Sequence, residues 1–233
     1  MFKYMVVIPA RSGSRGVLHK NTRYVGSKTL LDWSIEHAIE SMVNKIVVST
    51  NDPVAKVICE KYEDERLQCI DRPEEISTAT SASEDALIHA VEQQEEEPEF
   101  VIMLQPSSPF RFNRLVNRCI NHLEGENTDS LLTGLKLHDF FWHERYDRLI
   151  DKWGWFSSYK PDERKLRQQC VRTDYAYFDN GNISITRTKL LLETRCRVAG
   201  RTIIYPISHL ESMQIDTEEE LADCDRIARS FAG

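Results

Sequence analysis

The sequence predicts an α/β fold in which a mostly parallel β-sheet is wrapped by helices. Short β-branched runs alternate with helical patterns through the first 136 residues, and the alternation resumes after residue 179. Strands connected through crossover helices are typical of such a rhythm. With 233 residues, 41% of them hydrophobic, the chain is long enough for one substantial core. We therefore expect a single domain over residues 1–233.

Strands are expected where short apolar runs end at turn residues. The first run, Met5–Ile8, ends at Pro9, and Phe100–Leu104 has the composition of a fully buried strand. The other expected strands cover residues 45–50, 67–70, 130–137, 182–186 and 202–207.

Helices are expected where apolar residues recur every three or four positions. They begin near Leu30, after Pro53, at Ser81, near Asn113, at Lys189 and at Thr217. At Ser81 and Thr217 a hydroxyl residue is followed three positions later by Glu84 and Glu220, which predicts a capping box at each helix start.

The rhythm breaks between about residues 138 and 179, where the chain is aromatic and charged. Trp142, Trp153, Trp155, Phe156 and Tyr159 cannot all be exposed without cost, so we expect something to cover them. One interpretation is an irregular lobe that packs on its own sheet. The other is an inserted arm that forms a dimer.

Composition argues against several classes of protein. A net charge of −7 argues against a nucleic-acid coat and against adhesion to anionic membranes. The longest apolar runs have four or five residues, too few for a membrane span, and the N-terminus leads into a strand rather than a signal peptide. Six scattered cysteines without a CxxC pair predict free thiols in a cytoplasmic protein.

The segment after the first strand predicts a phosphate-binding loop. Residues 9–21 read PARSGSRGVLHKN, in which glycines, serines and fixed positive charges come together. Glycines let the backbone approach a ligand, while N–H groups and guanidinium groups bind phosphate. The pattern matches neither GxxxxGK[ST] nor GxGxxG, so a solvated turn is the alternative.

Further polar residues are expected at the same rim, because ligands bind beyond the carboxyl ends of strands. Arg72 either faces a base or phosphate or pairs with Glu74 or Glu75. Gln105 starts a proline-bounded turn that fixes its direction. Asp216 either caps the last helix or binds Mg²⁺, which takes one or two carboxylates together with phosphate oxygens and water.

Two more segments have a functional and a simpler interpretation. The basic polar cluster at residues 164–169 is suited to recognising carboxylates, or forms a solvated face. Asn180-Gly181 is first of all a turn before a strand.

Taken together, these motifs resemble those of the acylneuraminate cytidylyltransferases, enzymes that make CMP-sialic acid and related CMP-activated nonulosonic acids. The matches occur in family order along nearly the whole chain: IPARSGSRG with KN, DRP before a Ser/Thr stretch, LQPSSPFR, RQQ, NG before a strand, and IDTEEEL. The resemblance implies a three-layer, Rossmann-like nucleotidyltransferase fold. It also implies a homodimer, with a dimerisation and sugar-binding lobe inserted at about 138–179.

The activity implied is Mg²⁺-dependent transfer of CMP from CTP to the anomeric hydroxyl of an α-keto sugar acid, with release of pyrophosphate. Arg11, Lys20 and Asp216 are the implied catalytic residues, with Asp216 as the Mg²⁺ ligand. Gln105, Arg167, Gln168 and Asn180 are the implied sugar-binding residues. The implied CTP site comprises Ala10, Arg11, Ser12, Gly13, Ser14, Arg15, Gly16, Lys20, Asn21, Arg72 and Ser83.

Three positions depart from the family pattern. Gln214 stands where sialate enzymes usually have the first Asp of Asp-Ile-Asp, which predicts weaker Mg²⁺ binding or a second ligand from elsewhere. The usual proline is absent from Val17-Leu18-His19, which predicts a more mobile loop. Ser184 replaces a common aromatic residue, which predicts a different sugar pocket.

Two other functions stay open. One is activation of the eight-carbon acid Kdo, although RSGSRG…KN and RQQ fit the sialate branch better. The other is a degenerate CTP-binding protein without turnover, which Gln214 suggests and the retention of Arg11, Lys20, Gln105 and Asp216 opposes. Neither a nucleic acid nor a membrane is an expected partner.

Overall fold

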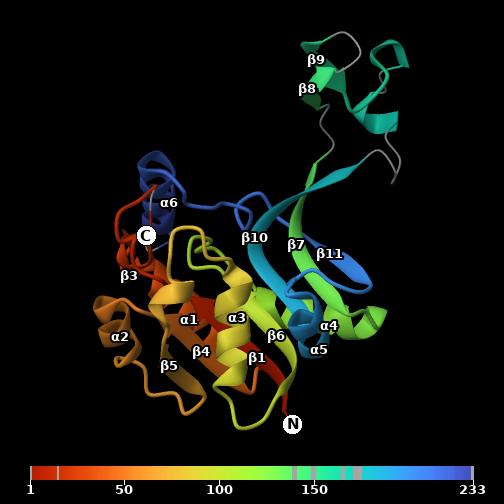
Figure 1. Cartoon of the computed structure of the whole chain (residues 1–233). Helices are drawn as coiled ribbons and strands as arrows, with labels where there is room; N and C mark the ends of the chain where they lie inside the picture. The colour runs from red at the N-terminus through yellow and green to blue at the C-terminus, as the bar shows by residue number, and fades with distance from the viewer. Residues whose placement is uncertain are drawn as a thin grey trace.

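The structure, a computed structural model, describes residues 2–14, 16–137, 141–147, 151–163, 166–169 and 175–231, with only the backbone of Asp147, Pro161 and Arg167. Seven strands form one sheet in the order β11-β7-β10-β6-β1-β4-β5 (Figure 1). The strands are β1 Phe2–Pro9, β4 Lys45–Thr50, β5 Leu67–Asp71, β6 Pro98–Leu104, β7 Ser130–Leu137, β10 Ala176–Arg187 and β11 Thr202–Ile207.

The direction of the strands confirms the predicted, mostly parallel sheet. Four of its six pairings are parallel, and the two antiparallel ones are those that β10 makes with β6 and β7. β10 begins six residues before the predicted strand, and its early part, Ala176–Asp179, pairs with β7 alone. A register shift between Asp179 and Ser184 separates this early part from the part inside the sheet.

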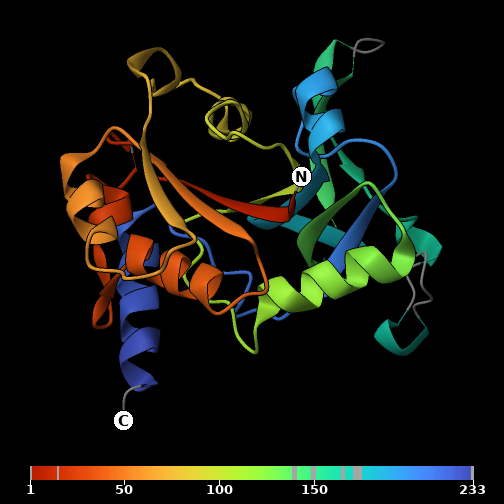
Figure 2. The ribbon, with the colours of Figure 1, turned by 90° about the horizontal axis from the view of Figure 1, so that it is seen from below.

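Helices cover both faces of the sheet and give three layers (Figure 2). α1 Leu30–Ile39, α2 Pro53–Cys59 and α4 Leu115–Glu126 lie on one face, whereas α3 Ser83–Glu92 and α5 Thr188–Thr194 lie on the other. Alternate residues of β1 supply both cores: Val6 and Ile8 pack with the first group, and Met5 and Val7 with the second. Each fully buried aliphatic side chain contributes about 1.5–3 kcal/mol to folding.

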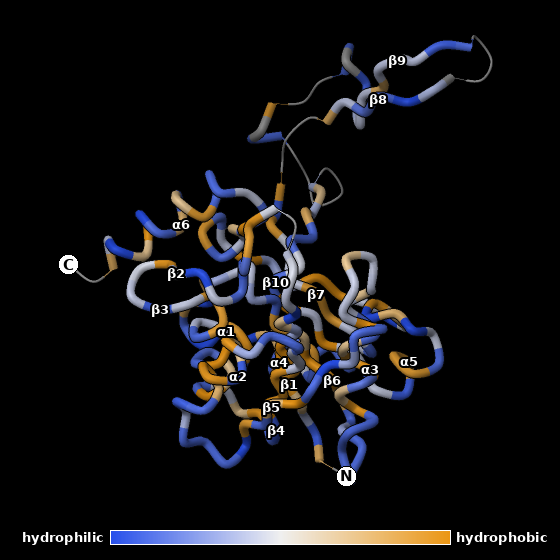
Figure 3. The backbone as a smooth tube through the Cα atoms, turned by 60° about the vertical axis from the view of Figure 1, so that its left-hand side comes forward, coloured by the Kyte–Doolittle hydropathy of each residue, from blue (hydrophilic) through white to orange (hydrophobic). Residues whose placement is uncertain are grey.

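A third core packs the last helix, α6 Glu218–Ser230, against β2 Tyr24–Val25 and the start of α1. β2 pairs with the short strand β3 Lys28–Thr29. The backbone coloured by hydropathy shows hydrophobic residues gathered in the sheet and on the inner sides of its helices (Figure 3). Within the described ranges, no helix combines the length and the apolar character that crossing a membrane requires. The five described cysteines are free thiols, as predicted; Cys170 lies outside the described residues.

The predicted capping box of α6 is confirmed. Thr217 Oγ1 accepts a 3.2 Å hydrogen bond from the Glu220 N–H, and the Glu220 carboxylate accepts one of 2.8 Å from the Thr217 N–H. The capping box thereby supplies acceptors for two of the N–H groups that the start of a helix leaves without an intrahelical partner.

The capping box predicted at Ser81 and Glu84 is wrong. α3 begins at Ser83, and the carboxylate that reaches back to the helix start belongs to Asp85, which accepts a 3.2 Å hydrogen bond from the Ala82 N–H. Glu84 instead forms a 2.8 Å ion pair with Arg197, so a tertiary contact takes the carboxylate that the local pattern assigned to the cap.

The chain between β7 and β10 forms an arm that stands away from the sheet (Figure 1). Its described part contains an antiparallel hairpin of β8 Trp142–Asp147 and β9 Lys152–Ser157. Trp153 and Trp155 are 66% and 65% exposed. In a single copy of the chain, these aromatic side chains are therefore not covered.

Candidate active site

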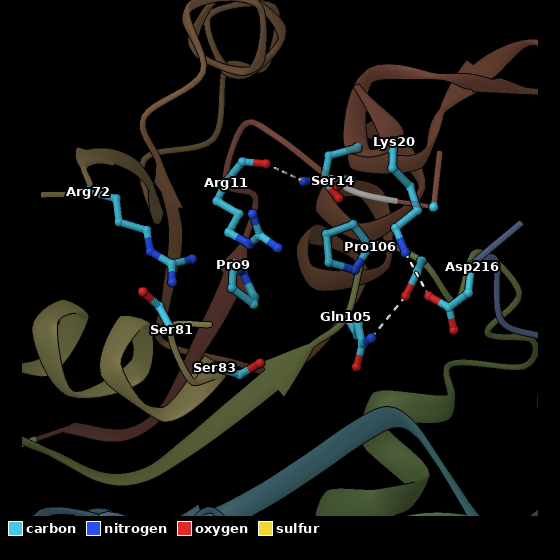
Figure 4. A pocket seen from close by; sticks show the side chains of 13 residues that line it. Pro9, Arg11, Ser14, Lys20, Arg72, Ser81, Ser83, Gln105, Pro106 and Asp216 are labelled. Carbon is cyan, nitrogen blue, oxygen red and sulfur yellow. Dashed lines mark hydrogen bonds and ion pairs between the residues drawn. The ribbon is translucent and has the colours of Figure 1, made fainter. Parts of the chain in front are cut away.

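A cavity of about 350 Å³ opens beyond the carboxyl ends of β1, β5 and β6 (Figure 4). The residues that line it come from the first loop, the segments after β5 and β6, the approach to α3, and the approach to α6. They are Pro9, Arg11, Ser14, Gly16, Lys20, Asn21, Arg72, Ser81, Ser83, Gln105, Pro106, Ser107 and Asp216. The segments that the sequence predicted at one rim are thus brought together.

The first loop is fixed to the end of the neighbouring strand β4. The Ala10 carbonyl accepts a 2.6 Å hydrogen bond from Thr50 Oγ1, and the Ser12 N–H donates one of 2.8 Å to Asn51 Oδ1. On the other side, Asn21 Nδ2 donates to the Arg11 carbonyl at 2.9 Å. These bonds hold the backbone of the loop across the mouth of the cavity.

Glycine is required where the loop meets the approach to α6. A Cβ atom on Gly16 would lie 1.9 Å from the Asp216 carbonyl oxygen, a distance that no side chain can accommodate. His19, in the stretch that lacks the family proline, has φ of +54°. Proline is locked near −65° and cannot stand at that position.

Among the described side chains, three cations face the cavity: Arg11 and Arg72 on one side, and Lys20 on the other (Figure 4). The Arg11 guanidinium donates to the Gly13 carbonyl at 3.0 Å. Arg72 is 5% exposed and its Nε donates to the Ile76 carbonyl at 2.8 Å. Among the described side chains it forms no ion pair, so the predicted pairing with Glu74 or Glu75 is not found.

The electrostatics of this wall favour an anion. Burial lowers the pKa of Arg72, and the neighbouring charge of Arg11 lowers it further. Among the lining residues that the structure describes, Asp216 is the single carboxylate, against three cations. Two like charges that repel each other in a partly desolvated site are stabilised when an anionic ligand binds near them.

Asp216 does not cap α6, because Thr217 does. Its N–H donates to the Glu220 carboxylate at 2.7 Å, and its own carboxylate lies 2.8 Å from Lys20 Nζ with 61% of the side chain exposed. The Ile215 N–H donates to the Ser107 carbonyl at 2.9 Å, which ties this segment to the turn after β6. The capping interpretation of Asp216 is therefore wrong, and its carboxylate faces the cavity.

The donor set fits a magnesium ion with few protein ligands. Mg²⁺ keeps several waters and binds one or two carboxylates together with substrate phosphates, and Asp216 supplies one such carboxylate. Gln214 is not among the lining residues. In the part of the chain that the structure describes, His, Cys, Asp and Glu residues form no cluster of three that could hold a metal by themselves.

Gln105 lines the cavity (Figure 4), and its amide lies close to Ser107 and Gly181. Its Nε2 donates to Ser107 Oγ at 3.0 Å. Its Oε1 lies 2.6 Å from the place where a side chain on Gly181 would begin. Gly181 itself has φ of +68°, so both space and backbone conformation require glycine there.

Several predicted site residues do not line the cavity. Ala10, Ser12 and Gly13 contribute through the loop backbone. Asn180 is 1% exposed, and its side chain contacts Thr133 and the Glu211 carbonyl.

The lobe residues cannot be placed in the site. Gln168 is exposed in the short helix η4 Arg167–Gln169 and is not among the lining residues. Arg15 and the side chain of Arg167 lie outside the described residues.

Four lining residues were not predicted: Pro9, Ser81, Pro106 and Ser107. Ser81 lies in the Ser/Thr stretch after DRP, and Ser107 follows the proline of LQPSSPFR, so both belong to motifs already singled out. Their position within these motifs could have identified them as site residues. Their residue types could not, because serine and proline are common in turns.

Residues 5–195 match the model of a family described as Cytidylyltransferase. This chain belongs to that family. The match includes four of the five segments that line the cavity, and Asp216 lies beyond it. The predicted nucleotidyltransferase class is confirmed, and so is the cytidylyltransferase part of the predicted family.

Individual cytidylyltransferases support the narrower resemblance. The chain is 26% identical over 221 residues to the N-acylneuraminate cytidylyltransferase of Streptococcus agalactiae serotype V, covering 94% of this chain and 51% of that protein. It is 27% identical over 215 residues to the enzyme of the same name from Escherichia coli O18:K1:H7, covering 92% and 49%. The chain thus spans about half the length of these two relatives.

A third relative has the length of this chain. It is the CMP-N,N'-diacetyllegionaminic acid synthase of Legionella pneumophila, 27% identical over 238 residues, with 97% of this chain and 96% of that protein covered.

Solved structures confirm the predicted three-layer nucleotidyltransferase fold. CMP:2-keto-3-deoxy-manno-octonic acid synthetase, solved in complex with CTP, gives a TM-score of 0.69 at 16% identity, with 98% and 99% of the two chains covered. The 4-diphosphocytidyl-2C-methyl-D-erythritol synthase of Anaerococcus prevotii gives 0.66 at 14% identity, with 97% and 96% covered.

Proposed function

We propose that this chain transfers CMP from CTP to the anomeric hydroxyl of a sialic-type sugar acid, with release of pyrophosphate. The observation that carries the proposal is the cavity itself. This chain belongs to the cytidylyltransferase family, and its cavity is lined by three cations, Arg11, Lys20 and Arg72. The amide of Gln105 and the carboxylate of Asp216 line the same cavity. The names of the similar proteins, for N-acylneuraminate and for N,N'-diacetyllegionaminic acid, favour this class of acceptor.

The first loop and Arg72 form the nucleotide half of the proposed site. Arg11, Ser14 and Lys20 would hold the triphosphate, because cations and hydroxyl donors converge there on the loop. Asn21, Arg72 and Ser83 would contact the cytidine from the two flanks of the same cavity. Little covalent work is required of the protein, since phosphoryl transfer depends mainly on positioning and on neutralising charge.

The acceptor half is built around Gln105. Its amide, oriented by Ser107 and Gly181, would hydrogen-bond the sugar acid, and Arg167 would pair with the acid's carboxylate. The anomeric hydroxyl would lose its proton to solvent, and its oxygen would form a bond to the α-phosphorus of CTP as the bond to pyrophosphate breaks. Lys20 would hold the negative charge that the departing pyrophosphate carries.

Mg²⁺ is part of the proposal, with Asp216 as its protein ligand. When bound, the ion would neutralise charge on the phosphate oxygens. Lys20 would then exchange its contact with Asp216 for one with the triphosphate.

We also propose that two copies of the chain associate through the arm. Trp153 and Trp155 are exposed on the hairpin, and exposed aromatic groups of this kind mark interaction surfaces. The family resemblance implies the same arrangement.

Pyrophosphate release from CTP tests the proposed function. It is measured with a panel of nonulosonic acids and with Kdo, with and without Mg²⁺. We expect Mg²⁺-dependent release with at least one nonulosonic acid. Release with Kdo alone would favour the Kdo activity, and CTP binding without release on any acid would favour a degenerate protein.

The variant Gln214→Asp tests whether the amide of Gln214 weakens Mg²⁺ binding. Replacing the amide in Gln214→Asp restores the family's carboxylate two residues before Asp216. We expect the Mg²⁺ concentration for half-maximal turnover to fall several-fold, because added ligand charge raises cation affinity. Gln214→Asn, which stays neutral, is the control, and an unchanged value in Gln214→Asp would contradict the expectation.

A further inference from the structure

Arg111 is a buried arginine without an acidic partner among the side chains that the structure describes. It is 2% exposed and lies in the turn after β6, six residues beyond Gln105. Its Nη2 donates to the Gln105 carbonyl at 2.7 Å and to the Asn182 carbonyl at 3.2 Å. Its Nη1 lies 3.4 Å from Ser34 Oγ, and its Nε has no hydrogen-bond partner there.

Stability does not explain an arginine at this place. Burying a guanidinium without a counter-ion is costly, and neutral carbonyl acceptors offset only part of that cost. The desolvation lowers the pKa of Arg111 to about 9. Replacing buried ionic groups by apolar residues of similar volume is often neutral or stabilising, so the specific geometry of the guanidinium calls for another reason.

That geometry joins the two segments that orient Gln105. One is the main chain of Gln105 itself, and the other is β10 at Asn182, the residue directly after Gly181. The Gln105 N–H also donates to the Asn182 carbonyl, at 3.3 Å. Gly181 in turn presents its bare Cα to Gln105 Oε1. A shift between the two segments would therefore move the amide.

We propose that Arg111 is a positioning residue for the acceptor half of the site: it clamps Gln105 to β10 and so fixes the direction of the Gln105 amide. The proposal rests on the proposed function only in taking the acceptor to be a sugar acid. Arginine suits the task because its planar fork donates to two carbonyls from one rigid group, whereas lysine is a point charge on a flexible stem.

Arg111→Lys tests the clamp while it keeps the charge. We expect the KM for the sugar acid to rise by about tenfold to a hundredfold, since small misplacements of a substrate-positioning group have effects of this size. The KM for CTP should stay within about twofold, because the nucleotide half is tied to β4 and not to β10. Arg114→Lys, three residues along in an exposed position, is the matched control.

A double variant shows whether Arg111 acts through Gln105. In a Gln105→Ala background, Arg111→Lys should add little to the KM for the acid, because the amide to be positioned is gone. Additive effects, or an equal rise in the KM for CTP, would overturn the proposal.

A second variant and a crystal structure keep the proposal testable if Arg111→Lys folds poorly or if the chain turns over no acid. Gly181→Ala leaves Arg111 in place and pushes directly on Gln105 Oε1, so it should give the same acid-specific defect. In crystals of ligand-free Arg111→Lys or Arg111→Met, the Gln105 amide should leave its contact with Ser107. If the amide keeps its place, the proposal is overturned whatever the turnover, whereas the proposed function fails only on the pyrophosphate assay.

Discussion

The ammonium group of Lys20 lies 2.8 Å from the carboxylate of Asp216, and the same group donates to the Ile215 carbonyl at 2.7 Å. The contact joins the first loop to the approach to α6 across 196 positions of sequence. In the ligand-free chain, the carboxylate therefore already has a cationic partner. Binding of a triphosphate would compete for that cation and free the carboxylate.

Asp216→Asn should separate turnover from nucleotide binding. We expect pyrophosphate release to fall by about 100-fold or more, because the proposed ligand of Mg²⁺ is lost and with it the neutralisation of charge in the transition state. CTP affinity measured without Mg²⁺ should not weaken, since the substitution removes a negative charge from the cavity. Glu218→Gln, which removes the carboxylate that pairs with Arg23, is the control. Near-normal turnover of Asp216→Asn would remove this residue from the mechanism.

Gly16→Ala should displace the first loop from Asp216. The added methyl group would meet the Asp216 carbonyl oxygen, and overpacking of this kind costs about 1–3 kcal/mol. Calorimetric titration should show weaker CTP binding, and chemical denaturation should show the lower stability. Gly125→Ala in α4 is the control, because nothing lies within 4 Å of that position. Equal CTP binding in the two variants would contradict the expectation.

His37 should make the stability of the chain depend on pH. Burial, helped by the charge of Arg111, lowers its pKa to about 3, and its Nε2 bonds the Pro109 carbonyl at 3.1 Å. Between pH 6.5 and 3, His37 is therefore protonated in the unfolded chain and stays neutral in the folded chain. The stability from the neutral ring is thus present above pH 6.5 and falls as the pH decreases, by about 1.4 kcal/mol per pH unit.

Chemical denaturation at pH 7.5 and pH 5 measures this slope. His37→Gln keeps a donor for Pro109 but cannot titrate, so we expect it to lose less stability than the wild type over this interval. The same change at the exposed His209 controls for the introduction of glutamine. A slope for His37→Gln equal to that of the wild type would show that His37 does not contribute to it.

The arm should determine the oligomeric state. Sedimentation velocity should show a dimer, and replacing Trp153 and Trp155 together by serine should give monomers. Tyr24→Ser is the control, because Tyr24 is an exposed aromatic residue on the body of the molecule. Deleting residues 140–165 should also give a monomer, with impaired sugar binding. A wild-type monomer, or a dimer that survives both changes, would contradict the proposed association.

The sequence predicted the sheet well because local patterns and burial agree there. The runs at 45–50, 130–137 and 202–207 match β4, β7 and β11 end for end. The topological rule for parallel sheets then brought Arg11, Arg72, Gln105 and Asp216 to one rim without knowledge of any contact.

Where sequence reasoning failed, a contact between distant residues decided the structure. The capping box predicted at Ser81 does not form, because Glu84 pairs with Arg197, which lies 113 positions away. Asn180 lies beside a register shift, where the alternation of faces along a strand is interrupted, so its burial did not follow from periodicity. In β9, Trp153 and Trp155 are both exposed. A strand is predicted from apolar residues that alternate with polar ones because one face is buried, and β9 lacks such a buried apolar face.

Because β10 runs antiparallel to its neighbours and follows the arm in the chain, the acceptor preference of related chains can change separately from their nucleotide preference. The two halves of the cavity rest on separate supports: the first loop on the segment after β4 and on the approach to α6, and Gln105 on β10, the strand that follows the arm in the chain. A chimera that exchanges residues 130–187 between two relatives would carry over the arm and the strand behind Gln105 as one unit. We expect it to inherit its acceptor preference from the donor of that unit and its nucleotide preference from the recipient.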